Sequence, residues 1–205
     1  MPVVLHKFIH DLTAIEEHHS LRGQPIAPRS QALIIGTFNP ADDGVAGANV
    51  ASWFYGRTGR GKFWRYFPTA LTGHSLHPRD GVAGHPDVWK EYCIENRVVI
   101  IDLIKSIDIP DLFPGFRDSD IERRIDDDLA NVNCFDIVAA FEGITFRRVV
   151  YSLLFTGRIP KIRQIRNSIN AALLAGGCID DEEQIKYCKT PSRGDAGPSW
   201  LAAFQ

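Results

Sequence analysis

Residues 33–40 read Leu-Ile-Ile-Gly-Thr-Phe-Asn-Pro, and the fold that the sequence predicts is built around them. The apolar run 33–35 predicts a short strand that is buried on both faces, as in a parallel sheet. Gly36 then allows the backbone to turn, and Pro40 disfavours a helical conformation at the residue before it. Asn39 is therefore expected on the rim beyond the carboxyl end of a central strand, where open α/β sheets bind ligands. The stretch also fits a strand that ends in an ordinary turn without function.

Further strands and helices are predicted along the rest of the chain. Apolar runs predict three more buried strands, over residues 98–102, 148–154 and 184–188. Helices are predicted over residues 5–19, 62–71, 86–97, 118–129, 134–142, 160–175 and 198–204. This alternation predicts an α/β fold, a three-layer α/β/α sandwich with a four-stranded, mostly parallel sheet. The chain has no internal repeat and no convincing linker, so residues 1–205 are expected to form a single domain.

Length, charge and hydropathy exclude several classes of protein. The 205 residues suffice for one α/β domain, and a monomer is expected. The formal net charge is −2, so a nucleic-acid partner would need a local basic patch. No apolar run approaches the ~20 residues that span a bilayer, and the N-terminus lacks the features of a signal peptide. No membrane partner is therefore expected.

The spacing of cysteine and histidine argues against a metalloprotein or a disulfide-bonded protein. The cysteines lie far apart and form no C-x-x-C pair: Cys93, Cys134, Cys178 and Cys188. This pattern favours a reducing cytoplasm, with the nucleoid as the expected location in a bacterium. An iron–sulfur site stays open only at Cys178 and Cys188, which could approach each other across a turn. The histidines show no H-E-x-x-H spacing, and we expect neither a metal nor another cofactor.

The loop predicted over residues 41–61 carries three large aromatic residues in a row, Trp53, Phe54 and Tyr55. Loops of this length in compact domains are usually functional or disordered. A solvated linker is not expected to contain three such side chains, so the loop indicates a function. Phe54 and Tyr55 either tie the loop down as a hydrophobic plug or provide a stacking platform for a planar heterocycle.

A basic, Gly-rich stretch follows, Gly56-Arg57-Thr58-Gly59-Arg60-Gly61-Lys62, which matches the first seven positions of a Walker A loop. The next residue is Phe63, where that loop needs Ser or Thr to bind magnesium, and no buried strand precedes it. The basic side chains have two further interpretations, a solvated face or a set of contacts to nucleic-acid phosphates. They are Arg57, Arg60, Lys62 and Arg65.

Asp102 and Lys105 flank the end of the predicted strand 98–102. A carboxylate at the end of a strand commonly caps a following helix. It can also act as a ligand-binding group at the carboxyl edge of the sheet.

Together, three motifs resemble those of the uracil-DNA glycosylase superfamily. The run 33–40 resembles the first family motif, a strand followed by a Gly turn and Pro. Phe54-Tyr55-Gly56 followed by Lys62-Phe63-Trp64 is similar to a pattern of the mismatch-specific uracil/thymine and hypoxanthine-DNA glycosylase branches. Thr190-Pro191-Ser192-Arg193 lies where the family has its second motif, a Pro-Ser loop after the last strand.

The resemblance implies a monofunctional, base-flipping DNA glycosylase that acts on uracil or hypoxanthine in base excision repair and needs no cofactor. Asn39 would hold the water that attacks the sugar, and Tyr55 would stack on the base. The other base-binding residues would be Thr37, Phe38, Phe54, Asp102 and Thr190. The DNA-binding residues would be Arg57, Arg60, Lys62, Ser192 and Arg193, with Arg193 entering the minor groove.

Two departures from the family pattern favour a second hypothesis. Thr190 occupies the position of a histidine that steadies negative charge in the strongest uracil enzymes, and neutral Asn39 cannot act as a general base. The alternative is a catalytically weak or inactive nucleic-acid-binding protein of the same fold. A P-loop-like nucleotide binder is the third hypothesis.

Overall fold

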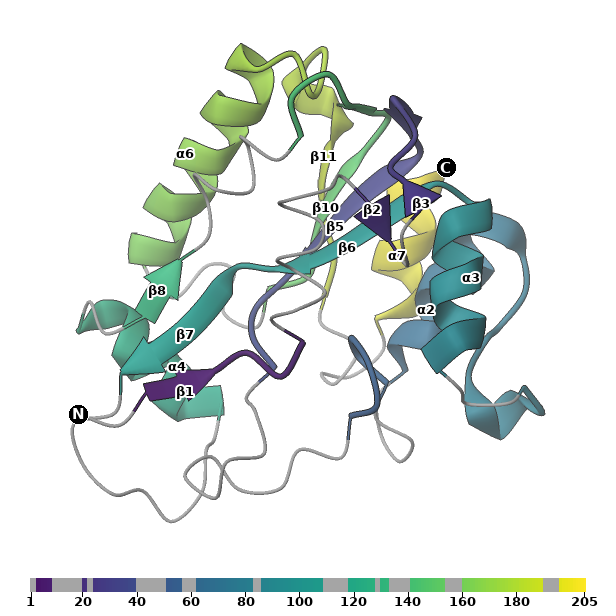
Figure 1. Ribbon diagram of the computed structural model, residues 1–205, viewed down its shortest axis with the longest axis horizontal. Helices are drawn as coiled ribbons and strands as arrows, with labels where there is room; N and C mark the ends of the chain where they lie inside the picture. The colour runs from purple at the N-terminus through teal and green to yellow at the C-terminus, as the bar shows by residue number, and fades with distance from the viewer. Residues whose placement is uncertain are drawn as a thin grey trace.

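Parallel strands form the centre of the protein in the order β11-β10-β5-β6 (Figure 1). They are β5 (Ala32–Gly36), β6 (Val98–Asp102), β10 (Val149–Tyr151) and β11 (Ile185–Tyr187). Each neighbouring pair is parallel, which confirms the four strands and the sheet that the sequence predicts. The structure is a computed structural model and describes residues 3–8, 20–21, 24–39, 51–56, 62–82, 86–108, 118–127, 130–132, 141–153, 160–189 and 196–205.

Burial explains why the apolar runs become strands of this sheet. Every residue of β5 and of β6 is buried, and their sequences are Ala-Leu-Ile-Ile-Gly and Val-Val-Ile-Ile-Asp. Helices cover both faces of a parallel sheet, so an unbroken apolar run fits both the internal strand β5 and the last strand of the order, β6. Gly36 and Asp102 are paired at the last position of the two strands, which sets both residues at the carboxyl edge.

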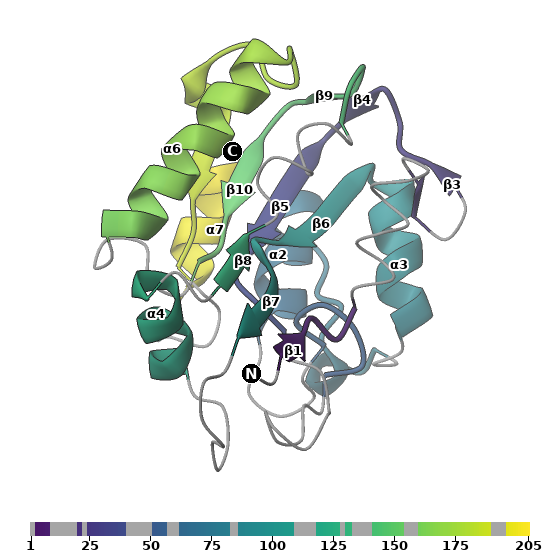
Figure 2. The same ribbon diagram turned by 60° about the vertical axis from the view of Figure 1, so that its left-hand side comes forward.

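Helices cover both faces of the sheet, which confirms the α/β class and is compatible with three layers. Figures 1 and 2 show α6 on one side and α2, α3 and α7 on the other. The helices are α2 (Phe63–Thr72), α3 (Pro86–Glu95), α4 (Asp118–Asp126), α6 (Pro160–Ala175) and α7 (Gly197–Phe204), with 3-10 turns at Pro78–Asp80 and Glu182–Gln184. The predicted helix over residues 134–142 lies almost wholly outside the described residues.

Pro68 lies inside α2 and leaves a backbone carbonyl without its helical partner. Proline has no N–H, so it cannot bond the Trp64 carbonyl four residues earlier. The Leu76 N–H bonds that carbonyl instead, at 2.8 Å, which folds the segment after the helix back onto it. The helix ends at Thr72, and the next residue, Gly73, adopts a left-handed conformation and donates its N–H to the Thr69 carbonyl.

An antiparallel sheet that the sequence did not predict continues from the end of β6. It consists of β1 (Val3–Leu5), β7 (Ile104–Asp108) and β8 (Ala130–Val132) in the order β1-β7-β8. The helix predicted over residues 5–19 is therefore wrong at its start, because residues 3–8 form a strand, a bridge and a turn. Pairing with β7 outweighs the helical spacing of apolar residues in this segment. The rest of the predicted helix, residues 9–19, lies outside the described residues. Smaller pairs join β2 (Ser20–Leu21) to β3 (Gln24–Pro25) and β4 (Arg29–Ser30) to β9 (Thr145–Phe146).

Stacked indole rings anchor the aromatic segment 51–56 beside α2 and α3. The Trp64 ring stacks on both Trp89 and Trp53. Its centroid lies 5.0 Å from that of Trp89, with an angle of 5° between the ring planes, and 5.8 Å from that of Trp53, with an angle of 21°. All three rings are buried, and rings of this size contribute strongly to core stability. The segment that carries Tyr55 is therefore held against the helical layer. In the described part of the chain, no helix is both long and apolar enough to cross a membrane.

Candidate active site at the carboxyl edge of the sheet

Asp102 is the centre of a buried polar cluster at the carboxyl ends of β5 and β6. Its side chain is fully buried, and its Oδ2 atom accepts hydrogen bonds from Asn39 Nδ2 at 2.7 Å and from His6 Nε2 at 2.8 Å. The Tyr55 hydroxyl lies 3.5 Å from Oδ1 and donates a longer bond. A buried carboxylate is costly unless it is hydrogen-bonded, and here three donors from three separate segments satisfy it.

The partners of His6 fix where its proton lies. His6 Nδ1 accepts the backbone N–H of Phe8 at 3.0 Å, so this nitrogen carries no proton. Nε2 therefore carries the ring N–H, which donates a hydrogen bond to Asp102. His6 is thus held in one neutral tautomer as a donor to the carboxylate.

The carboxylate also fixes the orientation of the Asn39 side chain. An ionised carboxylate only accepts hydrogen bonds, so the amide NH2 group has to face it. The Asn39 Oδ1 atom then points away from Asp102, and no described residue donates a hydrogen bond to it. Asn39 lies just after the carboxyl end of β5, as predicted, and it is buried there, with 6% of its surface exposed.

Backbone hydrogen bonds bring the N-terminal segment to this edge. The His6 N–H bonds the Lys105 carbonyl at 2.9 Å, which continues the β1–β7 pairing by one residue. The Lys7 N–H bonds the Asn39 carbonyl at 2.7 Å. The segment 6–7 is therefore tied both to β7 and to the turn after β5, and the His6 ring is placed between them.

Gly36 makes room for Tyr55 above the end of β5. A Cβ atom on Gly36 would lie 1.7 Å from the Tyr55 hydroxyl and 2.1 Å from Asp102 Oδ1. Tyr55 has a φ of 56°, which costs a residue other than glycine roughly 1–2 kcal/mol. The Tyr55 ring stacks on the Phe63 ring, with 4.1 Å between the centroids and 19° between the ring planes, and this contact holds the strained residue in place. Burial raises the pKa of Tyr55 well above its usual value, and the Asp102 charge adds to this, so the hydroxyl remains a donor.

The predicted catalytic residue, Asn39, and the predicted base-binding residues divide between the cluster and its surroundings. Asn39, Tyr55 and Asp102 meet, as described above. Asp102 is not a helix cap, because β7 follows it. Thr37 and Phe38 are buried beside the cluster, and the Phe38 ring contacts His6 edge-on at 5.7 Å.

Phe54 is fully buried and packs against His6 at 5.4 Å, which fits the interpretation as a hydrophobic plug. Its carbonyl accepts the indole N–H of Trp64 at 3.0 Å. Phe54 therefore supports the cluster from inside the core, and its predicted contact with a base stays a prediction. Thr190 lies outside the described residues.

Lys62 is the described member of the predicted DNA-binding set. It is exposed at the start of α2, and its ammonium lies 5.9 Å from the centre of the Tyr66 ring. The other members, Arg57, Arg60, Ser192 and Arg193, lie outside the described residues, as does most of the stretch that resembles a Walker A loop.

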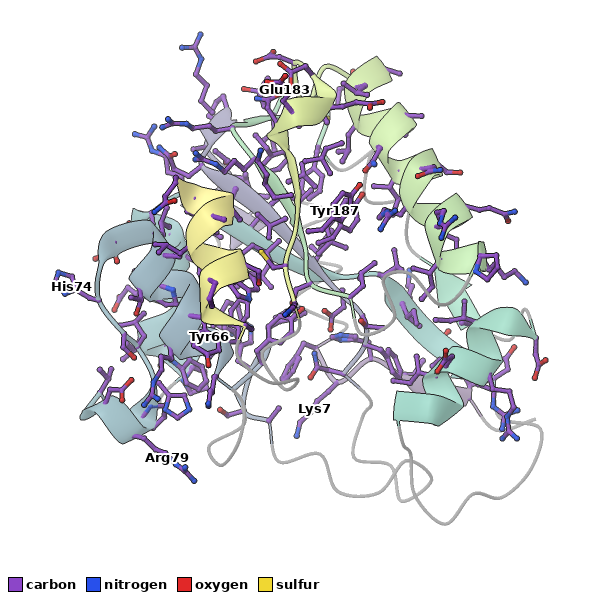
Figure 3. The ribbon with its side chains drawn as sticks, turned by 180° about the vertical axis from the view of Figure 1, so that it is seen from behind. Lys7, Tyr66, His74, Arg79, Glu183 and Tyr187 are labelled. Carbon is purple, nitrogen blue, oxygen red and sulfur yellow. The ribbon has the colours of Figure 1, made fainter. Side chains whose placement is uncertain are left out.

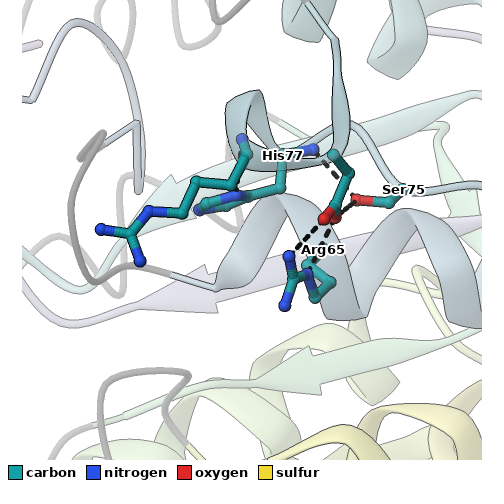
Figure 4. Close-up of polar contacts among 5 residues, drawn as sticks. Arg65, Ser75 and His77 are labelled. Carbon is teal, nitrogen blue, oxygen red and sulfur yellow. Dashed lines mark hydrogen bonds and ion pairs between the residues drawn. The ribbon is translucent and has the colours of Figure 1, made fainter.

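Arg65 forms an ion pair within its own region. Both Arg65 Nε, at 2.8 Å, and an Arg65 terminal nitrogen bond the Asp80 carboxylate, which also accepts from the Ser75 hydroxyl (Figure 4). These bonds lower the pKa of Asp80 below its usual value. The His77 N–H donates to the Ser75 hydroxyl at 3.1 Å, and His77 Nδ1 accepts the Arg79 N–H at 3.2 Å. Arg65 is therefore engaged by the 75–80 turn.

His6 and Lys7 are site residues that the sequence interpretation missed. Figure 3 shows Lys7 toward the carboxyl edge of the sheet and Glu183 toward the opposite edge. The signal in the sequence was the β-branched pair Val3-Val4 before Leu5 and His6, which favours a strand. In the described segments, no three His, Cys, Asp or Glu side chains converge in a way that could hold a metal ion.

Searches against protein-family models, curated proteins and solved structures each returned no match. The geometry of the cluster is therefore the basis for the functional argument.

Proposed function

We propose that the protein is a monofunctional DNA glycosylase that hydrolyses the N-glycosidic bond of a flipped, deaminated base. The substrate class is uracil or hypoxanthine in DNA, as the resemblance of the motifs implies. The observation that carries the proposal is the orientation of Asn39. Its NH2 group bonds Asp102 at 2.7 Å, so its Oδ1 atom faces away from that carboxylate and receives no hydrogen bond from the described residues.

This arrangement suits a water molecule that attacks the sugar. Asn39 Oδ1 would accept a hydrogen bond from the water and direct its lone pair toward C1′. The water oxygen bonds to C1′ as the C1′–N bond breaks, and the bonding electron pair leaves with the base. The proton that the water loses passes to solvent or to the departing base.

Asp102 supplies the charge that Asn39 lacks. The amide cannot take the proton from water, but the carboxylate behind it polarises the amide and makes Oδ1 a stronger acceptor. Positive charge also develops on the sugar during glycosidic hydrolysis, and a fixed, buried negative charge nearby stabilises it. His6 and Asn39 both donate to Oδ2, which fixes the direction of that carboxylate.

One observation favours the alternative, a nucleic-acid-binding protein without strong activity. The Tyr55 hydroxyl occupies the space above Gly36, next to the carboxylate, where a flipped base would approach. Tyr55 would have to move or to stack on the base from its present position for catalysis to occur.

Duplex oligonucleotides with a single uracil or a single hypoxanthine lesion test the proposal. After incubation and alkali treatment, strand breakage at the lesion supports the glycosylase. Asn39→Ala should abolish most of the breakage without preventing binding. Binding without breakage by the wild-type protein would support the alternative, and neither binding nor breakage would reject both.

A further inference from the structure

Ser152 belongs to the same cross-strand row as Gly36 and Asp102. The strands β10 and β5 pair up to Tyr151 and Ile35, and the Ser152 N–H then bonds the Ile35 carbonyl at 2.9 Å. In a parallel ladder this bond sets Ser152 opposite Gly36. Since Gly36 is paired with Asp102, the three residues lie side by side at the carboxyl edge.

The Ser152 side chain points to the face of the sheet that carries Tyr55 and α2. The Tyr151 hydroxyl donates to Asn170 of α6 at 2.7 Å, so Tyr151 points toward the opposite layer. Successive residues of a strand alternate between faces, which directs Ser152 away from α6. Cys188, the next residue in the row, confirms this direction, because its thiol lies 3.4 Å from the Ser199 carbonyl of α7.

The Ser152 hydroxyl is buried without a hydrogen-bond partner. The residue is 1% exposed, and no described residue bonds its Oγ atom. Buried hydroxyls in folded proteins are nearly always bonded, so an orphaned one at the edge of a site is a candidate for bonding a ligand. Neighbouring strands lie about 4.8 Å apart, which puts Ser152 on the far side of Gly36 from Asp102. The Tyr55 hydroxyl occupies the column between them.

We propose that Ser152 is a ligand-contacting residue of the Asp102 site and donates a hydrogen bond to a carbonyl oxygen of the flipped base. The proposal rests on the proposed glycosylase function. Uracil and hypoxanthine both carry such an oxygen, and negative charge grows on the base as the C1′–N bond breaks. A hydroxyl donor in a buried site stabilises that charge more in the transition state than in the bound substrate.

Ser152→Ala, compared with Ser30→Ala, tests the assignment. Ser30 is also buried, but it lies just before the amino end of β5 and its hydroxyl donates to the Ala27 carbonyl at 2.9 Å. We expect Ser152→Ala to melt at the wild-type temperature or higher and to release base at least tenfold more slowly in single-turnover assays. Ser30→Ala should melt at a lower temperature and retain the wild-type rate.

A lowered melting temperature for Ser152→Ala would show that the hydroxyl is bonded within the fold, and a wild-type rate would show that it does not touch the base. Either result overturns the assignment. If the wild-type protein releases neither base, the proposed function fails, and free uracil and free hypoxanthine become the probes. A thermal shift that the wild type shows and Ser152→Ala loses would then support Ser152 as a ligand contact. No shift, or an equal shift, would overturn it.

Discussion

The Asn39 amide nitrogen lies 2.7 Å from Asp102 Oδ2, although the two residues are 63 positions apart in the chain. The bond joins the turn after β5 to the last residue of β6. It gives Asn39 two roles, because the residue satisfies a buried carboxylate and presents its own oxygen at the sheet edge. A change at Asn39 is therefore expected to alter both stability and activity.

Asn39→Ala should slow base release on the order of a hundredfold, as for the loss of a preorganised hydrogen-bonding group. It should also lower the free energy of unfolding by about 1–3 kcal/mol, because the buried carboxylate loses a donor. Affinity for lesion DNA should change little, since phosphate contacts dominate it. Single-turnover rates, urea midpoints and binding titrations measure the three effects. An Asn39→Ala variant that is stable and excises the base at the wild-type rate would contradict the catalytic role of Asn39.

His6 is expected to act as a positioning residue through Asp102. His6→Ala should lower the free energy of unfolding by roughly 1.5–3 kcal/mol, since a hydrogen bond to a charged group is lost, and should slow base release. His6→Gln keeps a side-chain N–H donor and should recover part of both losses. His74→Ala is the control, because His74 is exposed. Equal rates for His6→Ala and His6→Gln would contradict a role through the donated hydrogen bond.

The raised pKa of Tyr55 predicts a loss of stability in alkaline solution. An unfolded tyrosine ionises at about pH 10, whereas burial and the Asp102 charge keep folded Tyr55 protonated at higher pH. The stability that protonated Tyr55 contributes to the fold is therefore complete below pH 10. It falls as the pH rises toward the pKa of Tyr55 in the folded state. Urea unfolding of the wild type and Tyr55→Phe should show their difference in free energy shrinking above pH 10. A constant difference would mean that Tyr55 ionises normally.

Salt dependence can separate Lys62 from Arg65. Lys62 is exposed, and if it contacts a phosphate, Lys62→Ala should reduce the slope of log affinity against log salt by about one unit. Arg65 is already bonded by Asp80, so Arg65→Ala should leave the slope nearly unchanged. Equilibrium binding to a lesion duplex at several salt concentrations measures both. If the slope changes for Arg65 and not for Lys62, the DNA path lies closer to the 75–80 turn.

Local sequence patterns determined the main elements of the fold. The strands β5 and β6 are continuous apolar runs, and α6 begins and ends where its pattern predicts, at Pro160 and Ala175. The place of Asn39, after a Gly turn and before Pro40, also follows from residues that are neighbours in the chain. Each of these features depends on a period or a turn preference that a short window contains.

Only the tertiary structure decided which groups meet Asp102. His6 lies 96 positions from Asp102 in the chain and reaches it because it follows the strand β1. With three residues, β1 is too short to be recognised from the sequence, where the helical spacing of apolar residues gives the stronger pattern. The vacancy above Gly36 is filled by Tyr55, and Ser152 joins the row through strand pairing. Such contacts arise because distant segments bury their polar groups together, and no periodicity in the chain records that choice.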